Sequence, residues 1–361
     1  MKSITHPVAI VDETICRRNI SRMAQRVRKA GLQFRPHFKT HQSLRIGEWF
    51  RDEGVSSIVV SSPGMARYFM MGGWNDITLG IPATSANLDE IQALASKIRL
   101  KIFLNDIETA RYYDRQLTTP AEVWVELDAG YGRSGIDASQ PDRIKEIIDV
   151  LEHSSNLSFY GFYLHEGRTY QCRDTDSLKS LLAPVQRVLK ELHSRYPDRA
   201  ICLGDTPAFS ILDEYGPATE ASPGNFVFYD LMQTAIGSCN IEDVALTVLA
   251  PLLQSTSREK RGVLYGGAVH LSKERIRWRE KEVYGIPVSR SADSSEVLST
   301  GNYLYSLSQE HGMFRAEPDW LEKQRPGDIL RIWPVHSCLT ANLYRHYYTS
   351  EGHQIEKRIL S

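Results

Sequence analysis

The stretch RRNISRMAQRVRKAGLQFRPHFKTH, residues 17–41, contains one helical pattern followed by one strand pattern. Apolar residues recur at helical spacing through its first part, and Gly31 is a natural residue to end that helix. The run 33–38 that follows is typical of a strand, and Lys39 comes directly after it, between two histidines. The stretch therefore predicts a helix followed by a strand, with a lysine at the carboxyl end of the strand.

The same alternation continues over the first two thirds of the chain. Strand-like apolar runs alternate with helix-length amphipathic stretches such as 87–98 and 176–196. The strand candidates are 33–38, 55–60, 76–81, 100–104, 122–127, 157–164, 199–204 and a less regular run near 218–222. Alternating strands and helices imply parallel strands with helical crossovers, and about eight such strands close a barrel. We therefore predict an α/β fold, a (β/α)8 TIM-like barrel, with a doubly wound open sheet as the alternative.

The pattern changes after about residue 238. Strands linked by turns, with few long helices, are expected at 245–257, 260–271, 327–335 and 342–350. The opening run 8–11 is a candidate to join them. We predict a barrel domain over 14–238, and a smaller, mainly β domain over 239–361 that also takes the N-terminal strand within 1–13.

Composition argues against two classes of partner. The 361 residues carry a formal net charge of -1, with 24% charged side chains, so electrostatics favour neither a nucleic acid nor an anionic membrane. No apolar run approaches the roughly 18 residues that span a bilayer, and residues 1–20 lack the apolar core of a signal peptide. The cysteines are scattered without CxxC spacing. We expect a cytoplasmic protein with reduced thiols.

Seven short segments occur in the order found in one enzyme family. RPHFKTH (35–41) resembles the RPHxKTH motif of the D-threonine aldolase and D-serine dehydratase family, a branch of the fold-type III pyridoxal-phosphate enzymes headed by alanine racemase. The other segments are DAGYGRSG (128–135), GFYLHEG (161–167), GDTP (204–207), SPGN (222–225), EHG (310–312) and HSC (336–338). The resemblance covers essentially the whole chain. It implies an active site at the carboxyl ends of the barrel strands.

The resemblance assigns Lys39 to the lysine that binds pyridoxal phosphate covalently and later moves the substrate α-proton. An amine whose pKa is lowered by burial and by neighbouring positive charge suits both tasks. GDTP and SPGN fall where the loops after barrel strands seven and eight are expected, a place where barrels often bind phosphate. The phosphate candidates are Thr206, Gly224 and the Asn225 amide, and taken alone these are ordinary turn residues.

Three further residues match positions around the cofactor ring in the family. His165 corresponds to the histidine that packs against the ring in alanine racemases, its alternative being a hydrogen-bonded core histidine. Arg133 matches an arginine near the phenolic oxygen of the cofactor. Tyr170 is placed like the tyrosine that faces the pyridine nitrogen in D-serine dehydratases. A neutral partner at that nitrogen would leave the ring a weaker electron sink than a carboxylate would.

His336 and Cys338 form a candidate metal pair. Residues at i and i+2 on a strand point to the same face, so both side chains could reach one ion. Imidazole and thiolate together suit Zn²⁺, with the remaining positions left for water and substrate. In the family, D-serine dehydratases carry His-x-Cys here, whereas D-threonine aldolases usually carry His-x-Asp with a harder metal such as Mn²⁺. The alternative is a buried thiol beside a surface histidine.

Together these residues imply a pyridoxal-phosphate- and zinc-dependent lyase acting on a small β-hydroxy D-amino acid. Loss of the α-proton to Lys39 with departure of the hydroxyl would give a 2-oxo acid and ammonia, as in D-serine dehydratases, and Cys338 favours this reaction. Retro-aldol cleavage to glycine and an aldehyde stays open, as does racemisation. A catalytically silent cofactor carrier is a further alternative, which the C-terminal third argues against.

The sequence departs from the family pattern at three places. Gln42 follows KTH where a lysine is usual, SSPGMA (61–66) replaces a glutamate–alanine pair, and YGGAVHLSKE (265–274) replaces a DAGSKALS-like segment. His270, in the last of these, is a candidate substrate-contacting residue or a core histidine. These changes put D-serine in doubt as the substrate and leave a larger one, such as a 3-hydroxyaspartate, open. The family also implies a homodimer, in which the second domain of one subunit closes the barrel mouth of the other.

Overall fold

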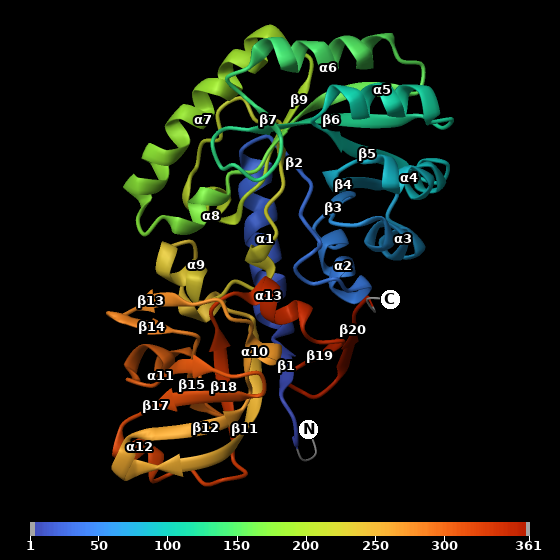
Figure 1. The fold of residues 1–361 in the computed structure, drawn as a ribbon. Coiled ribbons are helices and arrows are strands. Elements are labelled where there is room, and N and C mark those ends of the chain that lie inside the picture. The colour runs from blue at the N-terminus through green and yellow to red at the C-terminus, as the bar shows by residue number, and fades with distance from the viewer. Residues whose placement is uncertain (1–3, 359–361) are drawn as a thin grey trace. The chain divides into compact units, whose positions relative to one another are not determined.

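The computed structural model describes residues 4–358, which divide into two units (Figure 1). One unit, Ser21–Gly224, is called the barrel unit below. The other contains Met1–Ile20 and Asn225–Ser361, and is called the β unit. Helix α1 (Glu13–Lys29) belongs to the β unit at its start and to the barrel unit from residue 21. Each unit is described by itself.

The barrel unit is built on eight parallel strands. They follow the order β2-β10-β9-β8-β6-β5-β4-β3, and a parallel bridge between His37 and Val59 joins the two ends of this order. Backbone bonds Phe38 N–Val59 O (2.8 Å) and Val59 N–Pro36 O (2.9 Å) support that bridge. The predicted barrel is confirmed, and the open sheet is excluded. The strands are β2 (Gln33–Phe34), β3 (Ser57–Val60), β4 (Asp76–Pro82), β5 (Arg99–Leu104), β6 (Ala121–Asp128), β8 (Leu157–Leu164), β9 (Ala200–Leu203) and β10 (Glu220–Ala221).

Helices connect successive strands of the barrel, and Figure 1 shows α5, α6 and α7 outside the strands. Helix α1 ends before Gly31, whose φ of +71° is the left-handed conformation expected of a helix-ending glycine. Helix α7 begins at an N-cap, Asp174, which accepts a hydrogen bond from Ser177 N. The remaining helices are α2 (Leu44–Arg51), α3 (Pro63–Met71), α4 (Leu88–Ala95), α5 (Ile107–Gln116), α6 (Pro141–His153), α7 (Thr175–Arg195) and α8 (Thr206–Ile211), and a short strand β7 (Ile136–Asp137) pairs with β6.

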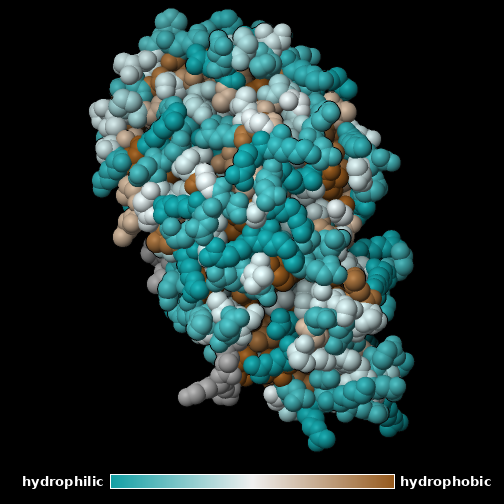
Figure 2. Space-filling view, turned by 180° about the vertical axis from the view of Figure 1, so that it is seen from behind, coloured by the Kyte–Doolittle hydropathy of each residue, from teal (hydrophilic) through white to brown (hydrophobic). Residues whose placement is uncertain are grey.

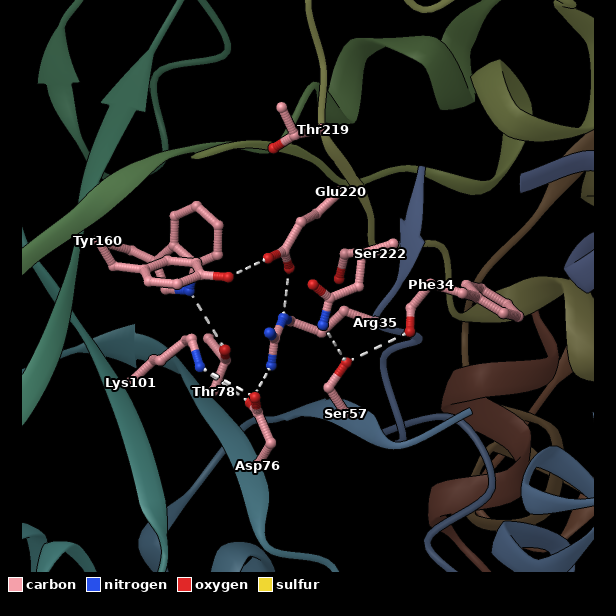
Figure 3. Close-up of polar contacts among 12 residues, drawn as sticks. Phe34, Arg35, Ser57, Asp76, Thr78, Lys101, Tyr160, Thr219, Glu220 and Ser222 are labelled. Atoms are coloured by element: carbon pink, nitrogen blue, oxygen red, sulfur yellow. Dashed lines mark hydrogen bonds and ion pairs between the residues drawn. The ribbon is translucent and has the colours of Figure 1, made fainter. Parts of the chain in front are cut away.

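A network of four charged side chains and one tyrosine lies within the barrel unit (Figure 3), and we call Arg35, Asp76, Lys101, Tyr160 and Glu220 the charged core. Arg35 and Lys101 are fully buried. Arg35 Nε donates to Glu220 Oε2 at 2.5 Å, and its Nη1 donates to Asp76. Lys101 Nζ contacts Asp76 Oδ1 at 3.0 Å, and the Tyr160 hydroxyl donates to Glu220 Oε1 at 2.5 Å. Each buried charge therefore has an opposite charge beside it, which burial in a protein interior requires.

The β unit is built on a mainly antiparallel sheet, and the predicted mainly β C-terminal domain is confirmed. Its order is β16-β17-β12-β11-β1-β19-β20, with β18 pairing with both β11 and β15. The opening strand β1 (Val8–Val11) pairs with β11, so the predicted place of the run 8–11 in this sheet is confirmed. The other strands are β11 (Leu246–Thr256), β12 (Arg261–Tyr265), β15 (Gly285–Ser289), β16 (Tyr303–Leu307), β17 (His311–Arg315), β18 (Ile329–Pro334), β19 (His346–Tyr348) and β20 (Gln354–Glu356), and β13 (Ile276–Trp278) pairs with β14 (Lys281–Val283).

Two expected strands of the β unit are shorter than predicted, and a short helix takes the place of the end of the first of them. The expected strand 260–271 is β12 only as far as Tyr265, and Ala268–Leu271 forms helix α10. The expected strand 342–350 is β19 alone. The other short helices are α9 (Leu231–Ile236), α11 (Ser294–Ser299), α12 (Pro318–Leu321) and α13 (Ser337–Asn342).

On the face drawn in Figure 2, hydrophilic side chains predominate and hydrophobic ones occur in small separate patches. Among residues 4–358, no helix is long and apolar enough to cross a membrane.

Candidate active site

The segment that carries Lys39 is fixed by its neighbours. His37 N donates to Pro223 O at 3.0 Å, and the Gln42 amide donates to Lys39 O at 3.1 Å. Phe38 is fully buried, and its ring centroid lies 4.9–5.0 Å from those of three aromatic residues on α2, on α3 and after α3. Packing of this kind restrains a side chain to one position. Lys39, half-buried, therefore follows a well-anchored residue at the carboxyl end of β2.

Positive and neutral nitrogen groups gather around Lys39. Burial holds the pKa of His37 well below its usual value, and the charges of Lys39, His165 and Arg133 lower it further. Burial likewise lowers the pKa of His165 to about 3, with Arg133 and Lys39 adding to the effect. Both imidazoles are therefore neutral near pH 7. The structure thus brings the predicted residues Lys39, His165 and Arg133 into one electrostatic neighbourhood, which favours an anionic guest.

The loop that carries Arg133 is organised by Asp128 at the end of β6. Its carboxylate accepts the backbone N–H groups of Gly130 (2.9 Å), Tyr131 (2.7 Å) and Gly132 (2.9 Å). Gly130 and Gly132 have φ values of +108° and +77°, which side-chain-bearing residues rarely adopt. The spacing of DAGYGRSG is therefore needed to fold this loop around one carboxylate.

Tyr131, which the sequence analysis did not single out, packs between the predicted residues. Its ring lies edge-on to that of His165, with centroids 5.8 Å apart, and the Arg133 guanidinium lies 5.6 Å from the Tyr131 ring centroid. A Cβ atom added to Gly167 would stand 2.2 Å from the Tyr131 ring, so the glycine of GFYLHEG leaves room for that ring. The signal in the sequence was the glycine on each side of Tyr131.

Two strand ends and their loops meet at the phosphate candidates of the barrel unit. Gly224 N donates to the buried Thr206 Oγ1 at 3.3 Å. A Cβ added to Gly224 would stand 3.0 Å from His37 O and 3.4 Å from Thr40 Oγ1, so this position is too crowded for a side chain. His165 Nδ1 forms a hydrogen bond with the carbonyl oxygen of Gly204, which precedes this loop. Thr206 and Gly224 therefore lie beside the segment that carries Lys39.

The side chain of Asn225 makes contacts that differ from those expected of a phosphate-binding residue. The Asn225 NH2 group donates to Asp230 Oδ2 at 2.7 Å and to Ser337 Oγ at 3.1 Å, both in the β unit. Its remaining polar atom, Oδ1, is an acceptor, which phosphate oxygens do not need. The expectation that the Asn225 amide faces a phosphate group does not agree with these contacts.

Tyr170 is half-buried in a short 3-10 helix, Gly167–Gln171, directly after GFYLHEG.

Asp205, in the GDTP segment, is a buried carboxyl group that the sequence analysis passed over. It is the N-cap of α8, and its Oδ1 accepts Ala208 N at 2.7 Å. Burial raises the pKa of Asp205 to about 7, against the lowering effect of the hydrogen bonds from Ala208 and Thr169. The negative charge of Glu166 adds to the rise.

The candidate metal pair lies on a helix start and not on a strand. Strand β18 ends at Pro334, His336 is the N-cap of α13, and Cys338 stands in the first turn of that helix. The strand argument for this pair was therefore wrong, because the backbone turns after Pro334. The two side chains nevertheless meet. Burial alone would lower the pKa of His336, but its hydrogen bond with Cys338 and the nearby negative charges raise it to about 9.

The surroundings of the pair contain buried polar atoms without a partner. Among residues 4–358, His336 Nδ1 and Asn225 Oδ1 are buried and have no hydrogen-bond partner. A buried nitrogen lone pair or N–H without a partner is costly unless a further group satisfies it.

His270, on α10, has its Nε2 3.9 Å from Glu310 Oε2, and Gly267 N donates to His270 Nδ1 at 3.3 Å. Within the described part of the chain, no three His, Cys, Asp or Glu side chains are arranged to hold a metal ion.

Comparison with known proteins agrees with this arrangement. Residues 11–231 match the family model described as "Alanine racemase, N-terminal domain". The chain belongs to this family. Residues 245–350 match a second model, described as "Putative serine dehydratase domain".

Two relatives are similar to this chain over nearly their whole length. D-threo-3-hydroxyaspartate dehydratase of Delftia sp. (strain HT23) is 29% identical, over 94% of this chain and 93% of the relative. D-serine dehydratase of Dictyostelium discoideum is 28% identical, over 96% and 94%. The solved Delftia enzyme superposes with a TM-score of 0.89 at 26% identity, covering 98% of each chain. One solved variant of that enzyme, with a cysteine changed to alanine, is described as being in the metal-free form.

A more distant likeness concerns the fold alone. D-threonine aldolase from Filomicrobium marinum superposes with a TM-score of 0.82 at 21% identity, covering 97% of this chain and 95% of that one. The barrel followed by a mainly β unit is therefore shared with an enzyme named for a different reaction.

Proposed function

We propose that this chain is a pyridoxal-phosphate-dependent lyase that removes the β-hydroxyl of a D-configured hydroxy amino acid, giving a 2-oxo acid and ammonia. The observation that carries the proposal is the electrostatic neighbourhood of Lys39, in which His37 and His165, both with a lowered pKa, interact with Lys39 and Arg133. The names of the two relatives with known activity, both dehydratases of D-amino acids, support the reaction.

The residues present fit pyridoxal phosphate. Thr206 offers a buried hydroxyl, which accepts the backbone N–H of Gly224, and the absence of a side chain at Gly224 leaves the backbone there open to close approach, which suits a phosphate group. Arg133 would neutralise the phenolic oxygen, and neutral His165 would pack against the ring. Tyr170 would face the pyridine nitrogen. When bound, the cofactor supplies the electron sink that makes the substrate α-proton removable.

Lys39 has two roles in this proposal. Its Nζ would hold the cofactor covalently and then accept the α-proton. The neutral form of the amine is the one that can act as a nucleophile and a base.

We propose that His336 and Cys338 bind a divalent metal ion, and that this ion is zinc. The unpartnered, buried His336 Nδ1 and the sulfur of Cys338 are the observations that fit a soft-ligand metal. The variant of the Delftia enzyme that is described as metal-free supports metal use among relatives. When bound, the ion supplies a Lewis acid for the substrate hydroxyl.

Trapping and product assays test the proposal. Borohydride reduction should attach the cofactor to the peptide that contains Lys39, and Lys39→Ala should lose both the label and the activity. A label on another lysine would contradict the assignment. Incubation with D-serine and with D-threo-3-hydroxyaspartate should release ammonia and a 2-oxo acid.

The same incubations distinguish the other reactions. Glycine with an aldehyde from D-threonine would indicate retro-aldol cleavage, for which the aldolase fold is the supporting observation. Loss of optical activity without ammonia would indicate a racemase. Chelation should abolish dehydration and added zinc should restore it, whereas full turnover without metal would remove His336 and Cys338 from the proposal.

The assembly and location remain part of the proposal. We propose that the domains 14–238 and 239–361 act together in a homodimer, supported by the family resemblance and testable by sedimentation of the active enzyme. Cytoplasmic location is supported by the cysteines, all five of which are free thiols in the structure. A fully active monomer in sedimentation would contradict the dimer.

A further inference from the structure

Asp230 is a fully buried carboxylate of the β unit to which the proposed reaction assigns no role. It is the N-cap of α9, where its Oδ1 accepts Gln233 N at 2.9 Å. Its Oδ2 accepts the Asn225 NH2 group at 2.7 Å and the backbone N–H of Ser337 at 2.8 Å. Ser337 is the first residue of α13. One carboxylate therefore joins the start of α9, Asn225 and the helix turn that carries Cys338.

Asn225 extends these contacts to the sulfur of Cys338. A carboxylate can only accept hydrogen bonds, so the NH2 end of the Asn225 amide must face Asp230. The same NH2 group lies 3.5 Å from Cys338 Sγ. Because a metal-bound thiolate keeps acceptor lone pairs, this N–H group can hold the sulfur in one orientation.

We infer that Asp230 and Asn225 are positioning residues for a divalent metal ion held by His336 and Cys338. Asp230 fixes the first turn of α13 through Ser337 N, and Asn225 orients the sulfur. The inference rests on the proposed function, because it takes the metal pair as given. Partners of this kind typically change metal affinity by about 10- to 100-fold when they are removed.

A purely structural role for Asp230 is the alternative, and a matched variant separates the two. Asp243 is also a buried carboxylate of the β unit. Its Oδ2 accepts Asn240 N at 3.1 Å, and its Oδ1 pairs with the Arg18 guanidinium at 3.0 Å. Asp243→Asn therefore removes a buried negative charge and weakens a backbone cap, as Asp230→Asn does, while leaving the Ser337 and Asn225 contacts in place.

The experiment measures metal affinity without substrate. Zinc dissociation constants are determined by chelator competition on the full chain with cofactor present, for the wild type, Asp230→Asn, Asn225→Ala and Asp243→Asn. Cobalt is then substituted, and its thiolate charge-transfer absorption reports on the sulfur ligand. Unfolding of the metal-free proteins is measured in parallel. Asn225→Ala removes the donor to the sulfur and leaves the Asp230 charge, so it tests the inference even where Asp230→Asn does not fold.

We expect Asp230→Asn and Asn225→Ala to weaken zinc binding by about 10- to 100-fold and to change the cobalt absorption. Asp243→Asn should bind zinc like the wild type even where it unfolds more easily. Equal zinc affinity in all four proteins would overturn the inference and leave the metal pair intact. A wild type that binds no zinc would instead overturn the metal pair itself, so the two failures are distinguishable.

Discussion

Replacing Asp205 by asparagine should make the stability of the protein less dependent on pH. Asp205 is 2% exposed and is the N-cap of α8 through Ala208 N. Burial raises its pKa to about 7. Asparagine caps helices about as well as aspartate, so Asp205→Asn keeps the cap and removes only the ionisable group.

The sign and size of the effect follow from the difference in pKa between the folded and unfolded chain. An aspartate carboxyl in the unfolded chain titrates near 3.8, and the pKa of Asp205 in the folded protein is about 7. Between these two pH values the folded state binds more protons than the unfolded state. Protonation of Asp205 therefore makes its full contribution to the free energy of unfolding below pH 3.8, and that contribution is lost as pH rises through 7. The loss amounts to at most about 4 kcal/mol, at about 1.36 kcal/mol for each pKa unit.

Urea unfolding of both proteins from about pH 5 to about pH 8 measures this contribution. The free energy of unfolding of Asp205→Asn, minus that of the wild type, should grow by up to about 2.7 kcal/mol over this range, because about two pH units of it lie below the folded pKa of about 7. Asp174→Asn is the control, because Asp174 caps α7 from an exposed position and its hydrogen bonds with Ser177 lower its pKa. It should gain no stability at high pH. Parallel curves for Asp205→Asn and the wild type would show that Asp205 stays ionised throughout, and would refute the reasoning.

Three further substitutions test the packing of the barrel unit. A Cβ at Gly161 would stand 2.0 Å from a carbonyl oxygen of β9, so Gly161→Ala should lower the free energy of unfolding, measured with urea, by on the order of 3 kcal/mol. The control is Gly301→Ala, which should be nearly neutral because a Cβ at Gly301 would have only one atom within 4 Å. Gly167→Ala should displace the Tyr131 ring and change the cofactor absorption and KM while the unfolding midpoint stays within experimental error; unchanged absorption and KM would place Tyr131 away from the cofactor. Arg35→Met leaves two carboxylates of the charged core without their arginine, so it should destabilise by about 3–5 kcal/mol, and a loss below 1 kcal/mol would argue that water already screens that core.

The barrel could be predicted from the sequence because its strands are buried on both faces. The run expected at 122–127 is β6 (Ala121–Asp128), in which six of eight residues are buried, so apolar content alone marks it. The first strand was harder to delimit. The run 33–38 is a strand only over Gln33–Phe34, after which the chain follows β3 through a single bridge at His37. Its pattern of apolar residues continues past the last regular pair, so the end of the strand cannot be read from it.

Motifs in the sequence point to particular candidate residues, but they do not show where a contact with a distant residue shapes the backbone. Lys39, Arg133 and His165 were identified through their motifs, and the structure places them together. The helix at His336–Cys338 was missed, because the contact from Asp230 to Ser337 N that helps to form it spans 107 positions in the sequence. A local pattern contains no information on such a contact.

Two turns that carry candidate residues, one turn in each unit, are held in the same way, and this bears on which substitutions matter. Asp128 holds the loop of Arg133 by accepting three backbone N–H groups, and Asp230 holds the turn of Cys338 by accepting one backbone N–H and one amide. Backbone N–H groups are the same in every residue, so neither carboxylate specifies the side chain that it positions. A chain could therefore keep every residue of the lysine and His-x-Cys motifs and still lose the geometry when one of these aspartates is replaced. We therefore expect substitution of Asp128 or Asp230 to impair the protein even though neither carboxylate is assigned a part in the proposed reaction.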